Sequence, residues 1–331
     1  MPLPIRRVPT LSLVVPVHNE TGSIEPFLAR TVPILKGLGK AFEYEVLFVD
    51  DGSTDATLAE LLAAREANPR IRIVALSRNF GKDTALAAGL AHATGHAVVP
   101  IDVDLQDPPE VIPQMVEKWR EGFDVVNARR SDRSSDTWLK RVTAKLFYQI
   151  FNQMADRPIL ENVGDFRLLD RRVVDVLNRF PERARFMKGL FSWVGFSHCT
   201  IDYQRAVRHA GESKWKYWKL WNFAVDGIAS FTTVPLRIWT YFGALIALLA
   251  FIYAAVLIVR TLAFGIDTPG YASLMVAVLF MGGINLLSLG VIGEYLGRTY
   301  TEVKGRPLYI VDRTWGFEPT PPAPKRAPAR K

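Results

Sequence analysis

Two long segments without a charged side chain lie in the last third of the sequence, and they constrain the fold more than any other feature. Residues 238–259 and 268–293 contain no Asp, Glu, Lys or Arg. About 20 apolar residues in a helix, rising about 1.5 Å each, cross a hydrocarbon core about 30 Å thick. Core helices of a soluble domain rarely need such length without any charge. We therefore expect two transmembrane helices within residues 235–297, with Ala272–Ile292 forming the second span.

Basic residues flank these segments unequally. Lys214, Lys216, Lys219 and Arg237 precede the first span, whereas the short connection from Arg260 to Gly270 balances one arginine against Asp267. The residues that follow the second span include eight basic ones: Arg298, Lys304, Arg306, Arg313, Lys325, Arg326, Arg330 and Lys331. Positive charge concentrates on the cytoplasmic side of membrane proteins. This predicts a multi-pass membrane protein with its N-terminal domain and its C-terminus in the cytoplasm.

The net charge of +8 is therefore mostly juxtamembrane, and we expect no nucleic-acid partner. Ser213–Phe223 mixes three lysines with five aromatic residues. This composition favours amphipathic helices at the membrane surface over residues 213–234, although an aromatic surface packed on the N-terminal domain is an alternative. Residues 298–331 are expected to form a cytoplasmic tail, disordered from Glu318, and Met1–Thr10 lacks the apolar core of a signal peptide. The spacing Gly293-x-x-x-Gly297 permits close helix contact within one subunit or in a homo-oligomer.

Apolar strands alternate with helices before residue 213. Leu11–Pro16, Tyr44–Val49 and Ile71–Leu76 each read as a buried strand that runs into a polar turn. Helical patterns occupy Thr57–Ala67 and Asp83–Ala93. Such alternation predicts an α/β domain over residues 1–212, with a mainly parallel sheet whose carboxyl edge gathers polar groups and binds ligands.

Two carboxylates follow a fourth apolar strand, Ala97–Ile101, at the same expected edge. Asp102 and Asp104 are two residues apart, so in an extended chain they lie on one face and can address one Mg²⁺ or Mn²⁺ ion. An Asp-x-Asp triplet is also common in solvated turns. The three neighbouring strands that end in polar turns favour the metal site, with coordination positions left open for a diphosphate.

Four segments at these strand ends resemble one enzyme family. They are Val15–Glu20, Val49–Asp55, Arg78–Lys82 and Asp102–Glu110. They resemble the family 2 glycosyltransferases and, more narrowly, the polyprenyl-phosphate glycosyltransferases, which include bactoprenol glucosyltransferases and dolichol-phosphate mannose synthases. The resemblance extends from about Leu11 to about Ile310. His18, Val103 and Asp83 stand where Tyr, Ala and Glu are common in that family.

The resemblance implies a nucleotide-sugar-binding domain of the GT-A type and a donor site in the strand-end turns. It places these residues at the nucleotide: Pro16, Val17, Glu20, Asp51, Lys82, Val103 and Gln106. It makes Asp104 the direct ligand of Mg²⁺ or Mn²⁺, with Asp102 and Gln106 in supporting roles. Asp50 and Asp55 are expected to orient their turn, because Asp often bonds to nearby backbone.

The resemblance also implies transfer of a sugar, with inversion, to a polyprenyl phosphate. Asp165 is the candidate base or orienting carboxylate, beside the metal-site pair Asp102 and Asp104. A phosphate monoester has a second pKa of about 6, so the acceptor phosphate is mostly dianionic at neutral pH and needs little help from a base. The residues expected at the acceptor phosphate are Arg130, Arg133, Arg167, Arg205, Arg208, Ser213 and Lys214.

UDP-glucose and undecaprenyl phosphate are the favoured substrates by this resemblance. GDP-mannose, UDP-galactose and a UDP-aminoarabinose derivative remain open as donors. A polysaccharide synthase shares the fold but carries a Gln-x-x-Arg-Trp element that this sequence lacks. A dinucleotide-binding dehydrogenase is disfavoured because Val17–Glu20 stands where a Gly-x-Gly-x-x-Gly turn would be.

Overall fold

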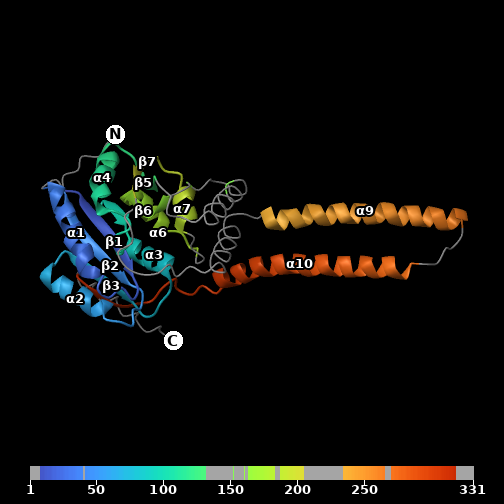
Figure 1. The fold of residues 1–331 in the computed structure, drawn as a ribbon, viewed down its shortest axis with the longest axis horizontal. Coiled ribbons are helices and arrows are strands. Elements are labelled where there is room, and N and C mark those ends of the chain that lie inside the picture. Colours follow the sequence, from blue (N-terminus) through green and yellow to red (C-terminus); the bar gives the residue numbers. More distant parts are fainter. Residues whose placement is uncertain are drawn as a thin grey trace, which may run out of the picture.

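The computed structural model describes residues 8–39, 42–131, 152, 160, 163–182, 187–204, 234–264 and 270–317. It contains an α/β domain and a long helical hairpin (Figure 1). The hairpin consists of α9 (Val234–Phe264) and α10 (Tyr271–Val303), which lie side by side and extend away from the domain.

One mostly parallel sheet of eight strands forms the centre of the α/β domain. The strand order is β7-β5-β6-β4-β1-β2-β3-β8. The neighbours among β1 to β4 pair in parallel, as do β5 and β7, whereas β6 and β8 run antiparallel to their neighbours. The strands are β1 (Thr10–Val17), β2 (Glu43–Asp50), β3 (Ile71–Leu76), β4 (Ala97–Pro100), β5 (Val125–Arg130), β6 (Val163–Asp170), β7 (His198–Tyr203) and β8 (Val311–Trp315). The predicted α/β class and mainly parallel sheet are confirmed.

Helices cover both faces of this sheet. On one face lie α1 (Ile24–Gly37), α2 (Thr57–Ala67) and α4 (Ile112–Arg120), the last preceded by the short 3₁₀ helix η2 (Pro109–Val111). On the other face lie α3 (Lys82–His92), α6 (Arg171–Asn178) and α7 (Met187–Trp193). Because both faces are covered, the central strands are mainly apolar. The buried polar side chains among them include Ser12 in β1 and Glu45 in β2, and the Ser12 hydroxyl donates to the Glu45 carboxylate.

The pleat of β1 shows how the sequence divides the core. Leu11, Leu13 and Val15 face the core under α1, whereas Val14 faces the core under α3, and all four are fully buried. Helix α3 approaches β1 so closely that a Cβ atom on Gly89 would lie 2.3 Å from Cγ1 of Val14. Glycine at this position therefore sets how near the helix that begins with Lys82 lies to the sheet.

The chain returns to the sheet after the hairpin. Strand β8 pairs antiparallel with β3, and the amide of Ser77 donates to the carbonyl of Ile310 at 2.9 Å. The rings of Tyr309 and Phe317 lie 6.3 and 5.8 Å from that of His92 in α3. The sequence predicted only a cytoplasmic tail over residues 298–331, and the strand within it was missed.

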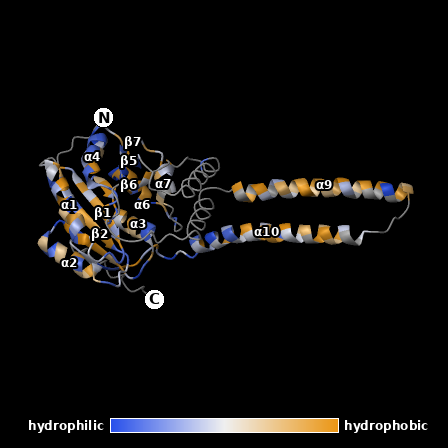
Figure 2. Cartoon of the chain, viewed as in Figure 1, coloured by the Kyte–Doolittle hydropathy of each residue, from blue (hydrophilic) through white to orange (hydrophobic). Residues whose placement is uncertain are grey.

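Membrane-spanning character is clearest in α10. Ser273–Val303 has the length and composition of a span, and its most apolar 18-residue stretch has a mean hydropathy of 2.2 and is not buried. Within α9 the described apolar stretch is Tyr241–Tyr253, which is shorter than the about 20 residues that a span requires. The expectation of two transmembrane helices is thus met by one helix among the residues described here. Figure 2 shows apolar residues along both helices, with polar residues at the end of α10 nearest the domain.

Candidate active site

The turns after β1 and β2 lie together at the carboxyl edge of the sheet, as predicted. The amide of Asp51 donates to the carbonyl of Val17 at 2.9 Å, and the amide of Asn19 donates to Oγ of Ser53 at 3.0 Å. Oδ1 of Asn19 accepts from the amide of Thr54 at 2.8 Å. These bonds fix the Val15–Glu20 turn against the turn that follows β2.

Pro16, Val17 and Glu20, which were predicted to bind the nucleotide, lie in and just after β1 at this edge. Pro16 is half-buried, whereas the side chain of Val17 is buried in the core. The amide of Glu20 donates to Oγ1 of Thr57 at 2.8 Å, and its carboxylate accepts from Oγ of Ser23 at 3.3 Å. Of these three residues, Pro16 and Val17 offer backbone groups to a ligand, and Glu20 offers its carboxylate.

Asp51 joins the turn after β2 to the turn after β3. Its side chain is buried, and its two oxygens accept from the amides of Phe80 and Gly81 at 2.7 and 2.9 Å. Gly52 has a φ of 63°, and a Cβ atom there would lie 2.3 Å from the carbonyl carbon of Arg78. Only glycine lets the two turns approach this closely. Asp51, expected at the nucleotide base, thus also holds the turn that presents Lys82.

Asp50 and Asp55 orient their turn. Oδ1 of Asp50 accepts from the amide of Ser53 at 3.1 Å. Asp55 accepts from the amide of Thr57 at 3.0 Å and from the hydroxyl of Thr21 at 2.6 Å. Desolvation works against ionisation, but these hydrogen bonds hold the pKa of Asp55 well below its usual value. The prediction of a turn-orienting role for both residues is confirmed by these bonds.

Three charged side chains from three elements meet at this edge. Nζ of Lys82, at the start of α3, lies 2.8 Å from Oδ1 of Asp102, after β4, and 3.1 Å from Oδ2 of Asp165, in β6. Desolvation opposes the ammonium charge, yet the two carboxylates raise the pKa of Lys82 above its usual range. Desolvation, together with the nearby Asp165, raises the pKa of Asp102, while Lys82 opposes that rise. A single ammonium therefore holds the two carboxylates near each other.

Asp104 and Gln106 form the next part of the loop. The amide and Nε2 of Gln106 donate to Oδ1 and Oδ2 of Asp104 at 3.1 and 2.7 Å. Leu105, between them, has a φ of 56°, in the left-handed region that non-glycine residues rarely adopt. The side chain of Val103 packs in the core, so only its backbone is available to a nucleotide. The loop thus aims the Asp104 carboxylate while keeping it half-exposed.

The oxygen atoms on this loop suit a metal ion that is bound partly by the protein and partly by a substrate. Within the described ranges, no group of three or more His, Cys, Asp or Glu side chains is placed to hold a metal. Mg²⁺ commonly binds through one or two carboxylates and completes its coordination with substrate phosphates and water. Asp104 supplies a hard oxygen ligand of this kind, and Asp102 and the amide oxygen of Gln106 lie on the same loop.

Two of the predicted acceptor residues, Arg130 and Arg167, lie in the described part of the chain. Arg167 is buried, donates to the carbonyl of Gly164 at 2.5 Å and stacks 4.1 Å from the ring centre of Phe191. Burial lowers the pKa of Arg167 to about 10, although the charge of Asp165 opposes this. Its Nε has no hydrogen-bond partner among the described residues. The other five, Arg133, Arg205, Arg208, Ser213 and Lys214, lie outside the described residues.

A buried polar contact at this edge was missed by sequence reasoning. The hydroxyl of Tyr203 donates to Oδ1 of Asp107, and both side chains are buried. Nε of Arg130 lies 3.4 Å from the same hydroxyl. The one signal in the sequence is that Asp107 belongs to the Asp102–Glu110 segment; nothing local connects it to a tyrosine at the end of a distant strand.

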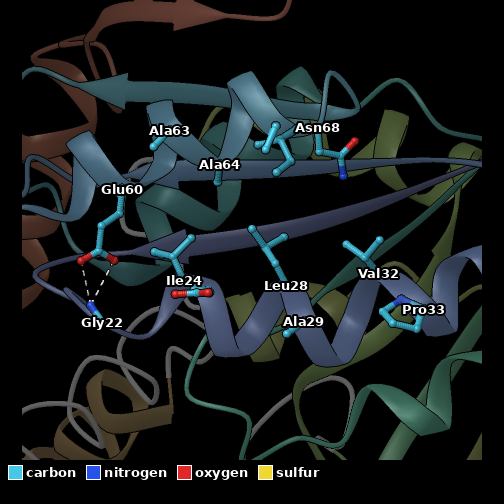
Figure 3. A pocket seen from close by; sticks show the side chains of 13 residues that line it. Gly22, Ile24, Leu28, Ala29, Val32, Pro33, Glu60, Ala63, Ala64 and Asn68 are labelled. Atoms are coloured by element: carbon cyan, nitrogen blue, oxygen red, sulfur yellow. Dashed lines mark hydrogen bonds between the residues drawn. The ribbon is translucent and has the colours of Figure 1, made fainter.

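A separate groove of about 700 Å³ lies between α1 and α2. In Figure 3, Leu28 and Val32 of α1 point towards Ala63 and Ala64 of α2, and the Glu60 carboxylate accepts from the amide of Gly22 at 3.0 Å. None of the site residues predicted from the sequence lines this groove. The charged edge with Lys82, and not this apolar groove, is therefore the candidate active site.

Comparison with known proteins decides the family. Residues 12–177 match the profile of glycosyl transferase family 2, and residues 234–299 match that of the GtrB C-terminal hairpin. The chain belongs to glycosyl transferase family 2. The predicted family is thereby confirmed, and the mostly parallel sheet agrees with its GT-A type of α/β fold.

Several relatives in this family match nearly the whole chain. A prophage bactoprenol glucosyl transferase homolog from Escherichia coli K12 is 52% identical over 303 residues, or 92% of this chain and 98% of its own length. The bactoprenol glucosyl transferase of Shigella phage SfII is 52% identical over 304 residues, with the same coverage. An uncharacterised glycosyltransferase from Synechocystis sp. is 54% identical over 311 residues, or 94% of this chain and 97% of its own.

Solved structures are more distant. Glucosyl-3-phosphoglycerate synthase from Mycobacterium tuberculosis, in complex with Mn²⁺, UDP-glucose and phosphoglyceric acid, gives a TM-score of 0.45 at 20% identity. The alignment covers 67% of this chain and 78% of that chain.

Proposed function

We propose that the protein is an inverting, metal-dependent glycosyltransferase that moves glucose from UDP-glucose to undecaprenyl phosphate. The observation that carries this proposal is the 52% identity, over 92% of the chain, to proteins named bactoprenol glucosyl transferase. The charged edge around Lys82, Asp102 and Asp104 supports it, because it gathers the carboxylates that such a transfer needs.

The donor is held in the strand-end turns. Pro16, Val17, Glu20 and Asp51 line the base and ribose, because carbonyl and carboxylate oxygens accept the hydrogen bonds that a uridine donates. Asp104, assisted by Asp102 and Gln106, would hold Mg²⁺ or Mn²⁺. The bound cation supplies charge stabilisation to the departing diphosphate. Lys82, close to both Asp102 and Asp165, adds a second positive charge on the same side.

The acceptor phosphate approaches from the side of β5 and β6. Arg130 and Arg167 supply guanidinium groups there, and Arg133, Arg205, Arg208, Ser213 and Lys214 complete the set in segments outside the described residues. Asp165 orients the acceptor side and takes up a residual proton from any monoanionic phosphate. A dianionic phosphate needs no such base.

The enzyme works at the cytoplasmic face of the bacterial inner membrane, and α9 and α10 both span. The match to the GtrB C-terminal hairpin covers α9 and all but the last four residues of α10, and residues 238–259 of α9 carry no charge. The basic residues that flank the spans favour the cytoplasmic side for the α/β domain. The amphipathic helices predicted over residues 213–234 lie outside the described residues up to 233. At the membrane surface they would keep the acceptor segment at the headgroups, where the phosphate of a lipid-linked acceptor resides.

A transfer assay with purified enzyme tests this function. The donors are UDP-glucose, UDP-galactose, GDP-mannose and a UDP-aminoarabinose derivative, each radiolabelled in the sugar and offered with undecaprenyl phosphate and Mg²⁺ or Mn²⁺. We expect labelled lipid from UDP-glucose and its loss when a chelator is added, with Asp104→Ala as the inactive control. A lipid product from a different donor replaces glucose in the proposal. No lipid product from any donor refutes the acceptor assignment.

A further inference from the structure

Tyr203 is a buried tyrosine that contacts three segments of the active site. It is the last residue of β7, and its ring packs edge-on against Phe166, with centres 5.9 Å apart and planes at 89°. Its hydroxyl donates to Asp107, five residues after Asp102 in the metal-site loop, and accepts from Nε of Arg130 at 3.4 Å. A single side chain therefore links the loop after β4 to the end of β5 and to Phe166 in the middle of β6.

The contact with Tyr203 determines where Arg130 points. Arg130 and Tyr203 are register partners in the parallel pair β5 and β7, so their side chains leave the sheet at the same level. Nη2 of Arg130 lies 3.9 Å from the position that a Cβ atom on Gly164 would take. The guanidinium thus lies over the residue before Asp165, with Nε directed at the tyrosine. The terminal N–H groups of the Arg130 guanidinium face the Gly164–Asp165 segment.

Tyr203 remains a hydrogen-bond donor at physiological pH. Burial, reinforced by the negative charge of Asp107, raises the pKa of Tyr203 above its usual range, although Arg130 opposes the rise. Asp107 is 6% exposed, and a carboxylate with so little water contact is stable only when it is hydrogen-bonded and paired. The tyrosine hydroxyl and the positive charge of Arg130 provide that environment.

We propose that Tyr203 is a positioning residue for sugar transfer: it fixes the Arg130 guanidinium beside Gly164 and Asp165 and ties it to the loop that carries Asp102 and Asp104. This inference rests on the proposed function, in which Arg130 binds the acceptor phosphate. In this proposal, the hydroxyl of Tyr203 fixes the position of the acceptor site relative to the metal site. Gln106, and not Tyr203, bonds to the Asp104 carboxylate, so a change at Tyr203 should affect the acceptor and leave donor binding intact.

The test is Tyr203→Phe, which removes the hydroxyl and keeps the ring that packs on Phe166. Tyr44→Phe is the matched control, because Tyr44 is also buried but belongs to the core under α1. In steady-state assays with UDP-glucose and undecaprenyl phosphate, we expect kcat/KM for the lipid phosphate to fall at least about tenfold in Tyr203→Phe. The KM for the donor and the Kd of UDP with Mn²⁺ stay within about twofold of wild type, and Tyr44→Phe keeps wild-type kinetics.

A double-mutant cycle then shows whether Tyr203 acts through Arg130. In an Arg130→Met background, Tyr203→Phe should cause no further loss. Wild-type acceptor kinetics in Tyr203→Phe, or an equal fold loss in both backgrounds, overturns the inference while leaving the proposed function standing. A wild-type enzyme that transfers no sugar to the lipid refutes the proposed function itself.

Variants of Asp107 keep the inference testable if Tyr203→Phe fails to fold. Asp107→Asn retains an oxygen that accepts from the tyrosine, whereas Asp107→Ala removes it. We expect Asp107→Asn to keep acceptor kcat/KM within a few-fold of wild type and Asp107→Ala to lose at least about tenfold. Equal losses in the two variants contradict a role for the hydrogen bond.

Discussion

Replacement of Asp51 by Asn separates the structural role of this carboxylate from its proposed role at the nucleotide. Asp51 is 3% exposed, and its two oxygens accept from the amides of Phe80 and Gly81 at 2.7 and 2.9 Å. Asparagine keeps one accepting oxygen and presents an NH₂ group to the other amide. One hydrogen bond to a charged group is therefore lost, and one buried backbone N–H is left without an acceptor.

The expected magnitude follows from this count. A hydrogen bond to a charged group contributes about 1.5–3 kcal/mol, so Asp51→Asn should lower the free energy of unfolding by about 2–3 kcal/mol. For a domain of this size, each kcal/mol shifts the melting temperature by about 2–4 °C, which gives a fall of about 4–12 °C. The measurement is thermal unfolding of the detergent-purified protein, followed by tryptophan fluorescence.

Asp202→Asn is the matched control, because it makes the same chemical change at a carboxylate that is 52% exposed and pairs with Arg129 at the surface. Such surface pairs contribute less than about 1 kcal/mol. The reasoning is refuted if Asp51→Asn melts no lower than Asp202→Asn. A weaker affinity for UDP at an unchanged melting temperature would assign Asp51 to the nucleotide alone.

Three further changes test the same edge of the sheet. Gly52→Ala should lower the free energy of unfolding by at least about 2 kcal/mol in thermal unfolding, because the new Cβ would lie 2.3 Å from the backbone of Arg78. Gly22→Ala is the control: its φ is 81° but the space around it is open, so it should cost only about 1 kcal/mol. Equal losses in the two variants would contradict the steric argument. Lys82→Met leaves Asp102 and Asp165 facing each other without the positive charge they share. The rate of sugar transfer, measured by steady-state kinetics, should therefore fall at least about tenfold, and Lys82→Arg should retain more activity. A wild-type rate in Lys82→Met would exclude the lysine from the reaction. The lowered pKa of Asp55 means that its charge stabilises the fold above the usual value of 3.8 and that this contribution is lost as the pH falls towards the folded-state pKa. The melting-temperature gap between wild type and Asp55→Asn should thus be constant above about pH 5 and narrow below about pH 4, and a gap that widens in acid would reverse the assigned sign.

The sequence was sufficient for the parts of the fold that are encoded locally. The apolar runs predicted β1 to β4 within a residue or two, and the helical pattern over Thr57–Ala67 coincides with α2. The strand-end turns could be placed on one edge because parallel strands, all pointing the same way, bring their carboxyl ends together. Asp102 and Asp104 were predicted in this way to lie at that edge, whereas Asp165 was assigned to the site only by the resemblance to the family.

Contacts between distant segments could not be predicted in this way. The pairing of β8 with β3 joins residues that are far apart in the chain, and no local pattern in Val311–Trp315 specifies its partner. The same holds for Lys82, whose contact with both Asp102 and Asp165 depends on how closely α3 and β6 approach the loop after β4. The contact between Tyr203 and Asp107 was missed for this reason too, because it forms only when β7 pairs with β5 at the sheet edge.

The return of the chain through β8 has a mechanical consequence for an enzyme whose acceptor is confined to a bilayer. Helix α10 leads through a short connection into a strand that is hydrogen-bonded to β3, and β3 leads directly into the turn that ends at Lys82. In the proposed membrane arrangement, the distance of the nucleotide-sugar site from the bilayer is therefore set by the backbone hydrogen bonds between β8 and β3. In that arrangement, only two strands separate α10 from the turn that ends at Lys82, so we expect the rate of sugar transfer to depend on bilayer thickness.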